Sequence, residues 1–244
     1  RIETHCYYIC KGITKKIALE EFESRDVDKK IYSVVDITYG FIADCDLESE
    51  NMRCLGMFRT TLFALIRYLC LRDYFGSLYY LPQSDDEEII NKLPSIKENI
   101  NDINEYGLLR ENDQWNMMIN SNIRCVSEDL LPNKLAEIDD GFDDLFVIPE
   151  SKGGGKWPLL RFLLTDIDNG DLFEGENEQL KSGYDYHKTK WWRFIPKKRR
   201  EDPDDVNIIH RWEQYYSIDG ERYPICPIQC KVLSKILPVY CGKD

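Results

Sequence analysis

The chain has 244 residues, of which 43% are hydrophobic and 31% are charged, and its formal net charge is -12. This length allows a substantial core, while the negative charge disfavours nonspecific nucleic-acid binding and electrostatic docking on anionic membranes. No apolar run approaches the roughly 20 residues of a membrane-spanning helix, so any membrane contact requires an apolar or locally basic surface patch.

The cysteine pattern is typical of a cytoplasmic protein with reduced, buried thiols, because several cysteines lie inside apolar runs and no signal peptide precedes them. Their odd number also opposes a complete disulfide framework. The spacing of Cys226 and Cys230 resembles half of a zinc site, but no second matching half is present, so we do not predict zinc there. The nine cysteines are Cys6, Cys10, Cys45, Cys54, Cys70, Cys125, Cys226, Cys230 and Cys241.

The first half of the chain begins with short apolar and basic pieces over residues 1–19, which we interpret as one or two strands. The run from Ile31 to Ala43 has the β-branched and aromatic content of a buried strand. Gly40 inside that run indicates close approach by another backbone or by a ligand.

Three acids follow this run at alternate positions: Asp44, Asp46 and Glu48. If the strand continues through them, its two-residue period points all three carboxylates to one face. Carboxylates can hydrogen-bond a hydroxyl or an ammonium group. The alternative is the ordinary solvated turn that follows many strands.

Residues 52–72 change to a helical period, and arginines stand on either side of Gly56. Guanidinium groups suit phosphate oxygens because of their planar fork, so Arg53 and Arg59 are candidates to bind a nucleotide. We expect Arg67 and Arg72 to face solvent. The apolar positions at three- and four-residue steps are Leu55, Phe58, Leu62, Leu65, Ile66 and Leu69.

The middle of the chain alternates strand-like and polar segments. A polar insertion is expected over residues 83–113, outside the core. The acids at residues 139–144 lack the ligand spacing of a calcium loop and indicate a solvated hairpin entry. Gly153-Gly154-Gly155-Lys156 is followed by Trp-Pro and does not fit a phosphate loop. Further strands are expected at 75–82, 115–126, 141–149 and 191–195, and a helix at 159–167.

A second acidic motif, Asp219-Gly220-Glu221, ends a strand predicted over residues 212–218. Such a tight turn presents two carboxylates, which can hold magnesium directly or through water, or orient a nucleotide. An ordinary hairpin turn is the alternative interpretation of the tripeptide alone.

Residues 40–62, GFIADCDLESENMRCLGMFRTTL, together with Arg67, Arg72 and the segment Tyr79–Pro82, resemble the substrate-recognition stretch of the sphingosine kinases. These enzymes belong to the diacylglycerol-kinase-like lipid kinases. The resemblance implies an α+β fold, mainly an antiparallel β-sandwich with helices that cover a lipid tunnel. It also implies that residues 1–244 form the C-terminal, lipid-binding domain, with the polar insertion at about 83–113.

The resemblance assigns roles to individual residues. Asp46 matches the position that binds the amino-alcohol headgroup, and Arg53 and Arg59 match two arginines that hold ATP phosphates. Met57 departs from the family, which has glutamate there. The turn Asp219, Gly220 and Glu221 matches a nucleotide-contacting turn. The tunnel wall is expected at Phe41, Ile42, Ala64, Leu65, Phe146, Phe162 and Leu163.

The implied function is ATP- and Mg²⁺-dependent phosphorylation of the primary hydroxyl of sphingosine or a related long-chain base, by a cytoplasmic protein with peripheral membrane contact. The family's Gly-Asp-Gly turn and Gly-Thr/Ser-Gly-Asn loop do not occur here. The general base is therefore expected in an N-terminal nucleotide domain that this chain lacks, and residues 1–244 alone should be inactive. The alternatives are a kinase of ceramide or diacylglycerol, and a truncated, non-catalytic lipid-binding protein.

Overall fold

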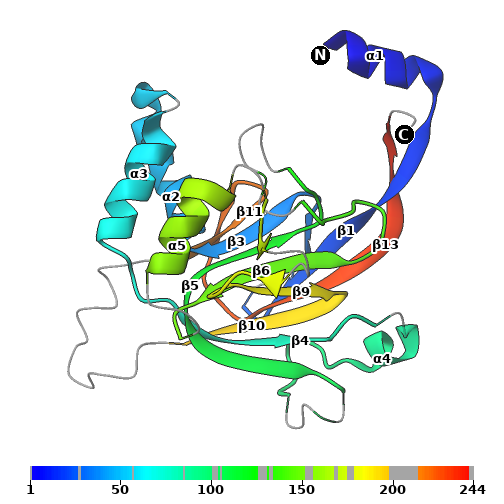
Figure 1. The fold of residues 1–244 in the computed structure, drawn as a ribbon. Coiled ribbons are helices and arrows are strands. Elements are labelled where there is room, and N and C mark those ends of the chain that lie inside the picture. The colour runs from blue at the N-terminus through cyan, green and yellow to red at the C-terminus, as the bar shows by residue number, and fades with distance from the viewer. Residues whose placement is uncertain are drawn as a thin grey trace.

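A computed structural model describes most of the chain (Figure 1). Met57, Gly153 to Gly155 and Trp212 lie outside the described residues, so the predictions made for them stay predictions. The described residues are 2–26, 29–56, 58–84, 86–100, 104, 106–125, 131, 134–151, 156–167, 170–174, 179–197 and 214–241.

The helices fall into two groups: those near the turn after strand β3 (Asp36–Gly40), which cover one face of the sheet, and those outside this region. The covering group is α2 (Phe41–Ser49), the 3₁₀ helix η1 (Glu50–Leu55), α3 (Phe58–Leu69), α5 (Trp157–Arg161) and the π-helix η2 (Phe162–Asp166). The others are α1 (Ile2–Lys11) and α4 (Glu87–Lys92).

Eleven strands of the described chain form one antiparallel sheet, in the order β12-β11-β3-β5-β4-β10-β13-β1-β2, with β6 between β5 and β9. The long strand β5 joins its two parts, because residues 109–114 pair with β4 and residues 115–121 pair with β3 and β6. The first strands are β1 (Thr14–Ser24), β2 (Ile31–Ser33), β3 (Asp36–Gly40), β4 (Phe75–Tyr80), β5 (Leu109–Ser121) and β6 (Asp143–Pro149). The later ones are β9 (Asp185–Thr189), β10 (Trp191–Lys197), β11 (Tyr215–Ile218), β12 (Glu221–Pro224) and β13 (Ile228–Tyr240), and β7 (Phe173–Glu174) and β8 (Gln179–Leu180) pair separately.

The predicted α+β class with a mainly antiparallel sheet is confirmed. The two layers expected of a sandwich are joined through β5 into one curled sheet (Figure 1). Strand β6 shows why the sheet has two apolar faces. Leu145 and Val147 enter one buried cluster, whereas Phe146 and Ile148 enter another beneath the covering helices. Alternate side chains of a strand point to opposite faces, so both faces of β6 are buried.

The N-terminal prediction of strands is wrong for residues 2–11, which form α1. Glu3 in its first turn and Lys11 in its last turn complement the helix dipole, and Gly12 ends the helix at a φ of +66°. Strand β1 then pairs along its length with β13. This pair of strands carries α1 away from the rest of the molecule (Figure 1).

Two glycines allow close approaches. At Gly40, which has a φ of +80°, a Cβ atom would lie 2.8 Å from the backbone oxygen of Asn116. The predicted approach by another backbone is therefore confirmed. At Gly76 a Cβ atom would lie 2.2 Å from the ring of Phe194, so this glycine of β4 leaves room for an aromatic ring of β10.

The polar insertion is more ordered than predicted. Leu109 to Asp113 belong to β5, and the preceding loop is attached to the sheet by the buried Arg193 of β10. Its guanidinium donates hydrogen bonds to the carbonyl oxygens of Pro94 (2.7 Å), Ser95 (2.9 Å) and Glu98 (2.8 Å). Burial lowers the pKa of Arg193 to about 10, so the side chain stays charged at neutral pH. Ile90 and Leu108 also pack in a buried apolar cluster with Leu81 and Trp191, so the expectation that this segment lies outside the core is wrong there.

The expectation of a solvated acidic hairpin at residues 139–144 is wrong for Asp143 and Asp144, which are buried. Asp143 lies with Glu20, also buried, and Asn120 donates hydrogen bonds to both carboxylates, at 2.8 Å to Glu20 and 3.0 Å to Asp143. The Cys230 thiol donates to Asp143 at 3.2 Å. Burial, with the Asp143 charge second, raises the pKa of Glu20, and burial raises that of Asp143 to about 6. The pair is therefore most stable when Glu20 carries a proton.

The expectation that the cysteine thiols are buried is correct for only some of the cysteines. Cys45, Cys226 and Cys230 are buried, Cys241 is partly exposed, and Cys6, Cys10, Cys54, Cys70 and Cys125 are exposed.

Candidate functional site

The chain changes from strand to helix at Gly40, so the acids that follow it lie on α2 and not on a strand. The prediction that Asp44, Asp46 and Glu48 share one face is therefore wrong. On a helix, residues four apart share a face, whereas residues two apart point in nearly opposite directions. Asp44 and Glu48 consequently form one acidic face of α2, and Asp46 lies on the other.

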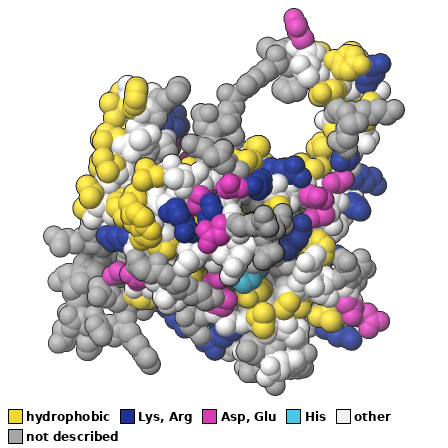
Figure 2. All heavy atoms as spheres, in the orientation of Figure 1, with side chains coloured by type: hydrophobic (Ala, Val, Ile, Leu, Met, Phe, Trp, Pro, Cys, Tyr) yellow, Lys and Arg dark blue, Asp and Glu magenta, His cyan; other side chains and the backbone are white. Residues whose placement is uncertain are grey.

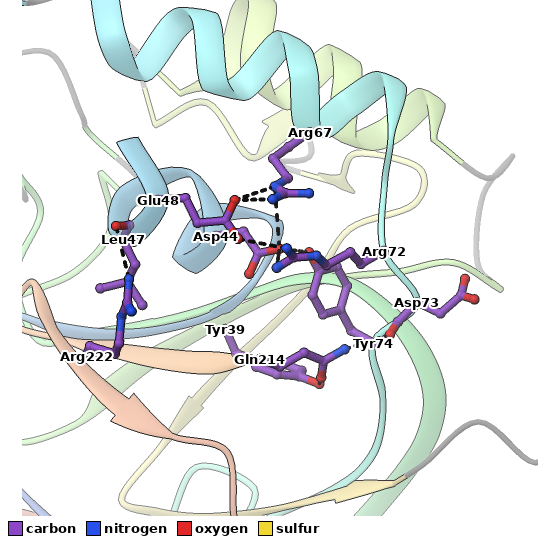
Figure 3. A network of polar contacts seen from close by, with 10 residues as sticks. All are labelled: Tyr39, Asp44, Leu47, Glu48, Arg67, Arg72, Asp73, Tyr74, Gln214 and Arg222. Carbon is purple, nitrogen blue, oxygen red and sulfur yellow. Dashed lines mark hydrogen bonds and ion pairs between the residues drawn. The ribbon is translucent and has the colours of Figure 1, made fainter. Parts of the chain in front are cut away.

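The Asp44–Glu48 face is neutralised by two arginines (Figure 3). Arg72 contacts Asp44 at 2.7 Å and Glu48 at 2.8 Å, and Arg67 from α3 also binds Glu48. The side chains of Arg67 and Arg72 are only 12% and 10% exposed, so the prediction that they face solvent is wrong. Tyr74 donates a further hydrogen bond to Asp44 at 2.7 Å. This network attaches α2 to α3 and to the sheet.

Burial is the largest influence on Asp44 and raises its pKa, although Arg72 and Tyr74 act in the opposite direction. The arginines therefore offset much of the cost of burying these carboxylates.

Asp46, on the other face of α2, is exposed and accepts a hydrogen bond from the Ser217 hydroxyl of β11 at 2.7 Å. Among the described residues, it forms no ion pair with an arginine or lysine. Asp46 and Asp219 both act electrostatically on Asp36. Arg222, which pairs with Ser217 across β11 and β12, donates a hydrogen bond to the carbonyl oxygen of Leu47 at 3.4 Å. Asp36 is buried, and this burial together with the two carboxylates raises its pKa to about 7. The three acids form a cluster that favours a cation.

Asp36 was not predicted from the sequence as a site residue. It is an acid within the apolar run IYSVVDITYG, and a charged residue in a buried strand is the type of exception that indicates a special environment.

The Asp219-Gly220-Glu221 turn links β11 to β12, and its two carboxylates have different environments. Asp219 accepts hydrogen bonds from the Ser33 hydroxyl (2.7 Å) and from three backbone N–H groups of residues 34–36, at 3.0 to 3.1 Å. It therefore holds the loop that leads into Asp36. Glu221 is exposed at the start of β12. Gly220 has a φ of +80°, and no atom lies within 4 Å of a Cβ added there.

Arg53 and Arg59 are brought together by one carboxylate. Both contact Glu50, with Arg59 at 2.8 Å, and their side chains are 75% and 29% exposed. The hydrogen bond from Arg53, followed by the one from Arg59, lowers the pKa of Glu50. Two guanidinium groups on a largely exposed surface are available to an anion that competes with Glu50.

An apolar cluster lies between the sheet and the covering helices. It contains six of the seven residues that were expected to form a lipid tunnel, whereas Leu65 lies outside it and is 57% exposed. The six are Phe41, Ile42, Ala64, Phe146, Phe162 and Leu163. Because α2 contributes Phe41 and Cys45 to this cluster and also carries Asp46, one helix connects the apolar cluster to the acid cluster.

The surface of α3 carries further apolar side chains. None of its residues is buried, and Phe58 and Leu69 are 80% and 69% exposed. Trp157 and Leu164 on α5 and η2 are also exposed, at 65% and 71%. Figure 2 shows hydrophobic side chains gathered over α3 and α5. Among the described residues, no helix has both the length and the apolar character needed to cross a membrane.

No model of a known protein family matches this chain. Individual proteins do match it. The sphingoid long chain base kinase 4 of Schizosaccharomyces pombe is 28% identical over 242 residues, which cover 93% of this chain and 48% of that protein. Sphingosine kinase 1 of Arabidopsis thaliana is 27% identical over 223 residues, covering 82% of this chain and 44% of that protein. Human sphingosine kinase 1 is 51% identical over 53 residues, or 22% of this chain and 14% of that protein.

Solved structures of other proteins have a fold similar to that of this chain. Two crystal structures titled as diacylglycerol kinases, from Bacillus anthracis str. Sterne, have TM-scores of 0.52 and 0.50 and cover 96% of this chain. The chain covers 60% and 57% of them, at 13% and 11% identity. The resemblance to the sphingosine kinases is thus confirmed over most of the chain, and the fold is diacylglycerol-kinase-like. The chain spans about half the length of the two long relatives it matches.

Proposed function

We propose that this chain is the lipid-binding part of a kinase that uses Mg²⁺-ATP to phosphorylate the primary hydroxyl of sphingosine or a related long-chain base. The observation that carries the proposal is the acid cluster at Asp36, Asp46 and Asp219, which adjoins the apolar cluster through α2. A long-chain base combines a cationic amine with an alkyl chain, and these two clusters match those two parts.

The headgroup binds at Asp46, whose exposed carboxylate pairs with the ammonium group and the neighbouring hydroxyls. Ser217 holds this carboxylate in position, and Asp36 adds negative potential. Ceramide carries an uncharged amide, and diacylglycerol has no nitrogen, so neither gains the charge-assisted hydrogen bond that an ammonium group makes. The acid cluster therefore favours a long-chain base over both rivals.

The alkyl chain lies along the apolar cluster, against Phe41, Ile42 and Phe162, with Phe146, Ala64 and Leu163 nearby. Leu65 belongs to the exposed surface of α3 and contributes to membrane contact instead. Burial of the alkyl chain supplies affinity in proportion to the apolar area removed from water.

The nucleotide is bound through Arg53 and Arg59, which exchange Glu50 for phosphate oxygens. Asp219 is already engaged by four donors, so it acts mainly by positioning the loop before Asp36. Exposed Glu221 is the better candidate to hold Mg²⁺ through water, as this ion commonly retains several waters. Bound Mg²⁺ would neutralise phosphate charge during transfer. The general base is supplied from outside these residues.

The protein reaches its substrate by peripheral contact between the exposed apolar face of α3 and a lipid surface. Leu62, Leu65 and Ile66 on this face are 39%, 57% and 40% exposed. A net charge of -12 makes such contact depend on apolar insertion and not on attraction to anionic lipids. The test is flotation with phosphatidylcholine vesicles. Leu65→Ser with Ile66→Ser should reduce the bound fraction severalfold, whereas Ile236→Ser on the exposed part of β13 should not.

The function is tested with radiolabelled ATP and the full-length protein against sphingosine, ceramide and diacylglycerol. Preferential turnover of sphingosine, lost or strongly reduced in Asp46→Asn, is expected. Preference for ceramide or diacylglycerol would assign a different lipid. Sphingosine binding without any phosphate transfer would instead support a non-catalytic lipid-binding protein. Residues 1–244 alone should bind the lipid and show no turnover.

A further inference from the structure

A cluster of metal-ligating side chains lies apart from the candidate site. Glu111 comes from the start of β5, and Asp185 and His187 come from β9. Asp185 and His187 are two residues apart on one strand, so their side chains point to the same face. One ligand atom from each of the three residues lies within 4.8 Å of the others. The separation between His187 Nε2 and Glu111 Oε1 is 3.7 Å.

The surroundings hold these side chains in place. The ring of Tyr80 stacks on the His187 imidazole, with centroids 4.0 Å apart and planes inclined by 26°. The side chains of His187 and Glu111 are 18% and 22% exposed, so the cluster is neither a solvated surface group nor sealed from ions in solution. Two of the three side chains are carboxylates, so the cluster offers oxygen ligands beside the imidazole at a half-buried position.

The distances suit a small divalent ion. Zinc–oxygen and zinc–nitrogen bonds of about 2.0–2.2 Å place neighbouring tetrahedral ligands about 3.4 Å apart. The ligand atoms of the cluster lie 3.7 Å apart for His187 and Glu111, and within 4.8 Å for all three residues. Binding a zinc ion would therefore require the separations between these atoms to shorten by up to roughly an ångström. An imidazole with two carboxylates suits first-row transition ions, whereas Mg²⁺ prefers an octahedron of oxygens.

We propose that Glu111, Asp185 and His187 bind a divalent transition-metal ion of the Zn²⁺ type, with water completing the coordination. The ion links β9 to the beginning of β5, where the hydrogen-bonded order of the sheet does not join these two strands directly. It therefore closes the curl of the sheet and stabilises the domain. This site is separate from the Mg²⁺ of phosphate transfer and does not depend on the proposed lipid substrate.

The test is a titration of the metal-stripped protein with Co²⁺. The absorption spectrum of bound Co²⁺ depends on the atoms that coordinate it, so the spectrum identifies the type of ligand. We expect one equivalent with visible d–d bands and without thiolate charge-transfer absorption, because none of the three ligands is a cysteine. His187→Gln and Asp185→Asn should each weaken binding by more than about tenfold. Glu88→Gln, which changes an 85% exposed acid on α4, is the matched control and should bind Co²⁺ normally.

A second readout distinguishes metal binding from a simple ion pair between His187 and Glu111. Zn²⁺ should raise the unfolding temperature of the wild type and of Glu88→Gln, but not that of either ligand variant. An absence of stoichiometric Co²⁺ binding, a thiolate spectrum or ligand variants that bind as tightly as wild type would overturn the proposal. Asp185→Asn leaves the imidazole stacked on Tyr80, so it remains informative if His187→Gln folds poorly.

Discussion

Helix α2 carries acids on two faces, and those faces differ in the groups that surround them. Asp44 and Glu48 meet Arg67 and Arg72, so their charges are compensated within the fold. Asp46 accepts a hydrogen bond from a serine hydroxyl and acts electrostatically on the buried Asp36. The comparison teaches that acids of one short motif can have different environments: the first pair attaches the helix, while Asp46 stays exposed beside Ser217.

The largest effect is expected from removing an arginine that pairs with the Asp44–Glu48 face. Arg72→Met leaves Asp44 buried beside one fewer cation, and we expect a loss of about 3 kcal/mol in the free energy of unfolding. Urea denaturation measures this change. Arg53→Met is the control, because its ion pair with Glu50 is largely exposed and should contribute less than about 1 kcal/mol. Equal losses in the two variants would show that the Asp44–Glu48 face does not hold the fold together.

The buried pair Glu20 and Asp143 extends the comparison, because a proton and not an arginine compensates it. The pKa of Glu20 in the folded protein is raised above the unfolded value, so its stabilising contribution is full at low pH. That contribution is lost as the pH rises from the unfolded pKa of about 4.3 towards the folded one, by at most about 1.4 kcal/mol per pH unit.

Glu20→Gln removes this titration while retaining a hydrogen-bond donor towards Asp143. Its unfolding free energy should depend less on pH between 5 and 8 than that of the wild type. Urea midpoints measured across this range provide the check. A wild-type profile that is flat, or that rises with pH through the Glu20 titration, would contradict a shared proton.

The role of Asp46, on the other face of α2, is tested by the variant Asp46→Asn. An amide cannot form the charge-assisted hydrogen bond to an ammonium group, so sphingosine should bind about 30-fold more weakly, corresponding to about 2 kcal/mol. The stability should change little, since Asn can still accept the Ser217 hydrogen bond. Glu48→Gln should show the reverse pattern: lower stability with nearly unchanged affinity. Fluorescence titration and urea denaturation of both variants separate the two roles.

The smallest expected effect concerns Asp36, whose pKa is about 7. Above this pH its carboxylate is charged and strengthens attraction for a cationic headgroup; below it, the group is neutral. Binding of a long-chain quaternary ammonium probe, whose own charge does not titrate, should therefore tighten a few-fold between pH 6 and 8. Asp36→Asn should remove this dependence, and an equally steep profile in that variant would assign the titration to another group.

Much of the fold could be predicted from the sequence. The apolar and aromatic runs of β4, β6 and β10 indicate strands, and the three- and four-residue steps in α3 indicate a helix. The resemblance of residues 40–62 to the sphingosine kinases placed Asp46, Arg53 and Arg59 in a candidate site. Gly40 indicated a close backbone approach, which Asn116 supplies. These features depend on local periodicity and local motifs, which the sequence contains directly.

Long-range contacts decided the rest. The apolar run before Asp44 is compatible with either strand or helix, and the turn at Gly40 against β5 decided for α2. The roles of its acids then followed from partners distant in the chain: Arg67 and Arg72 on one face, and Ser217 on the other. Likewise, Asp143 is buried because Glu20 and Asn120 surround it in the folded chain. Whether a carboxylate is compensated depends on which groups the fold places within a few ångströms of it, and sequence spacing alone does not determine those neighbours.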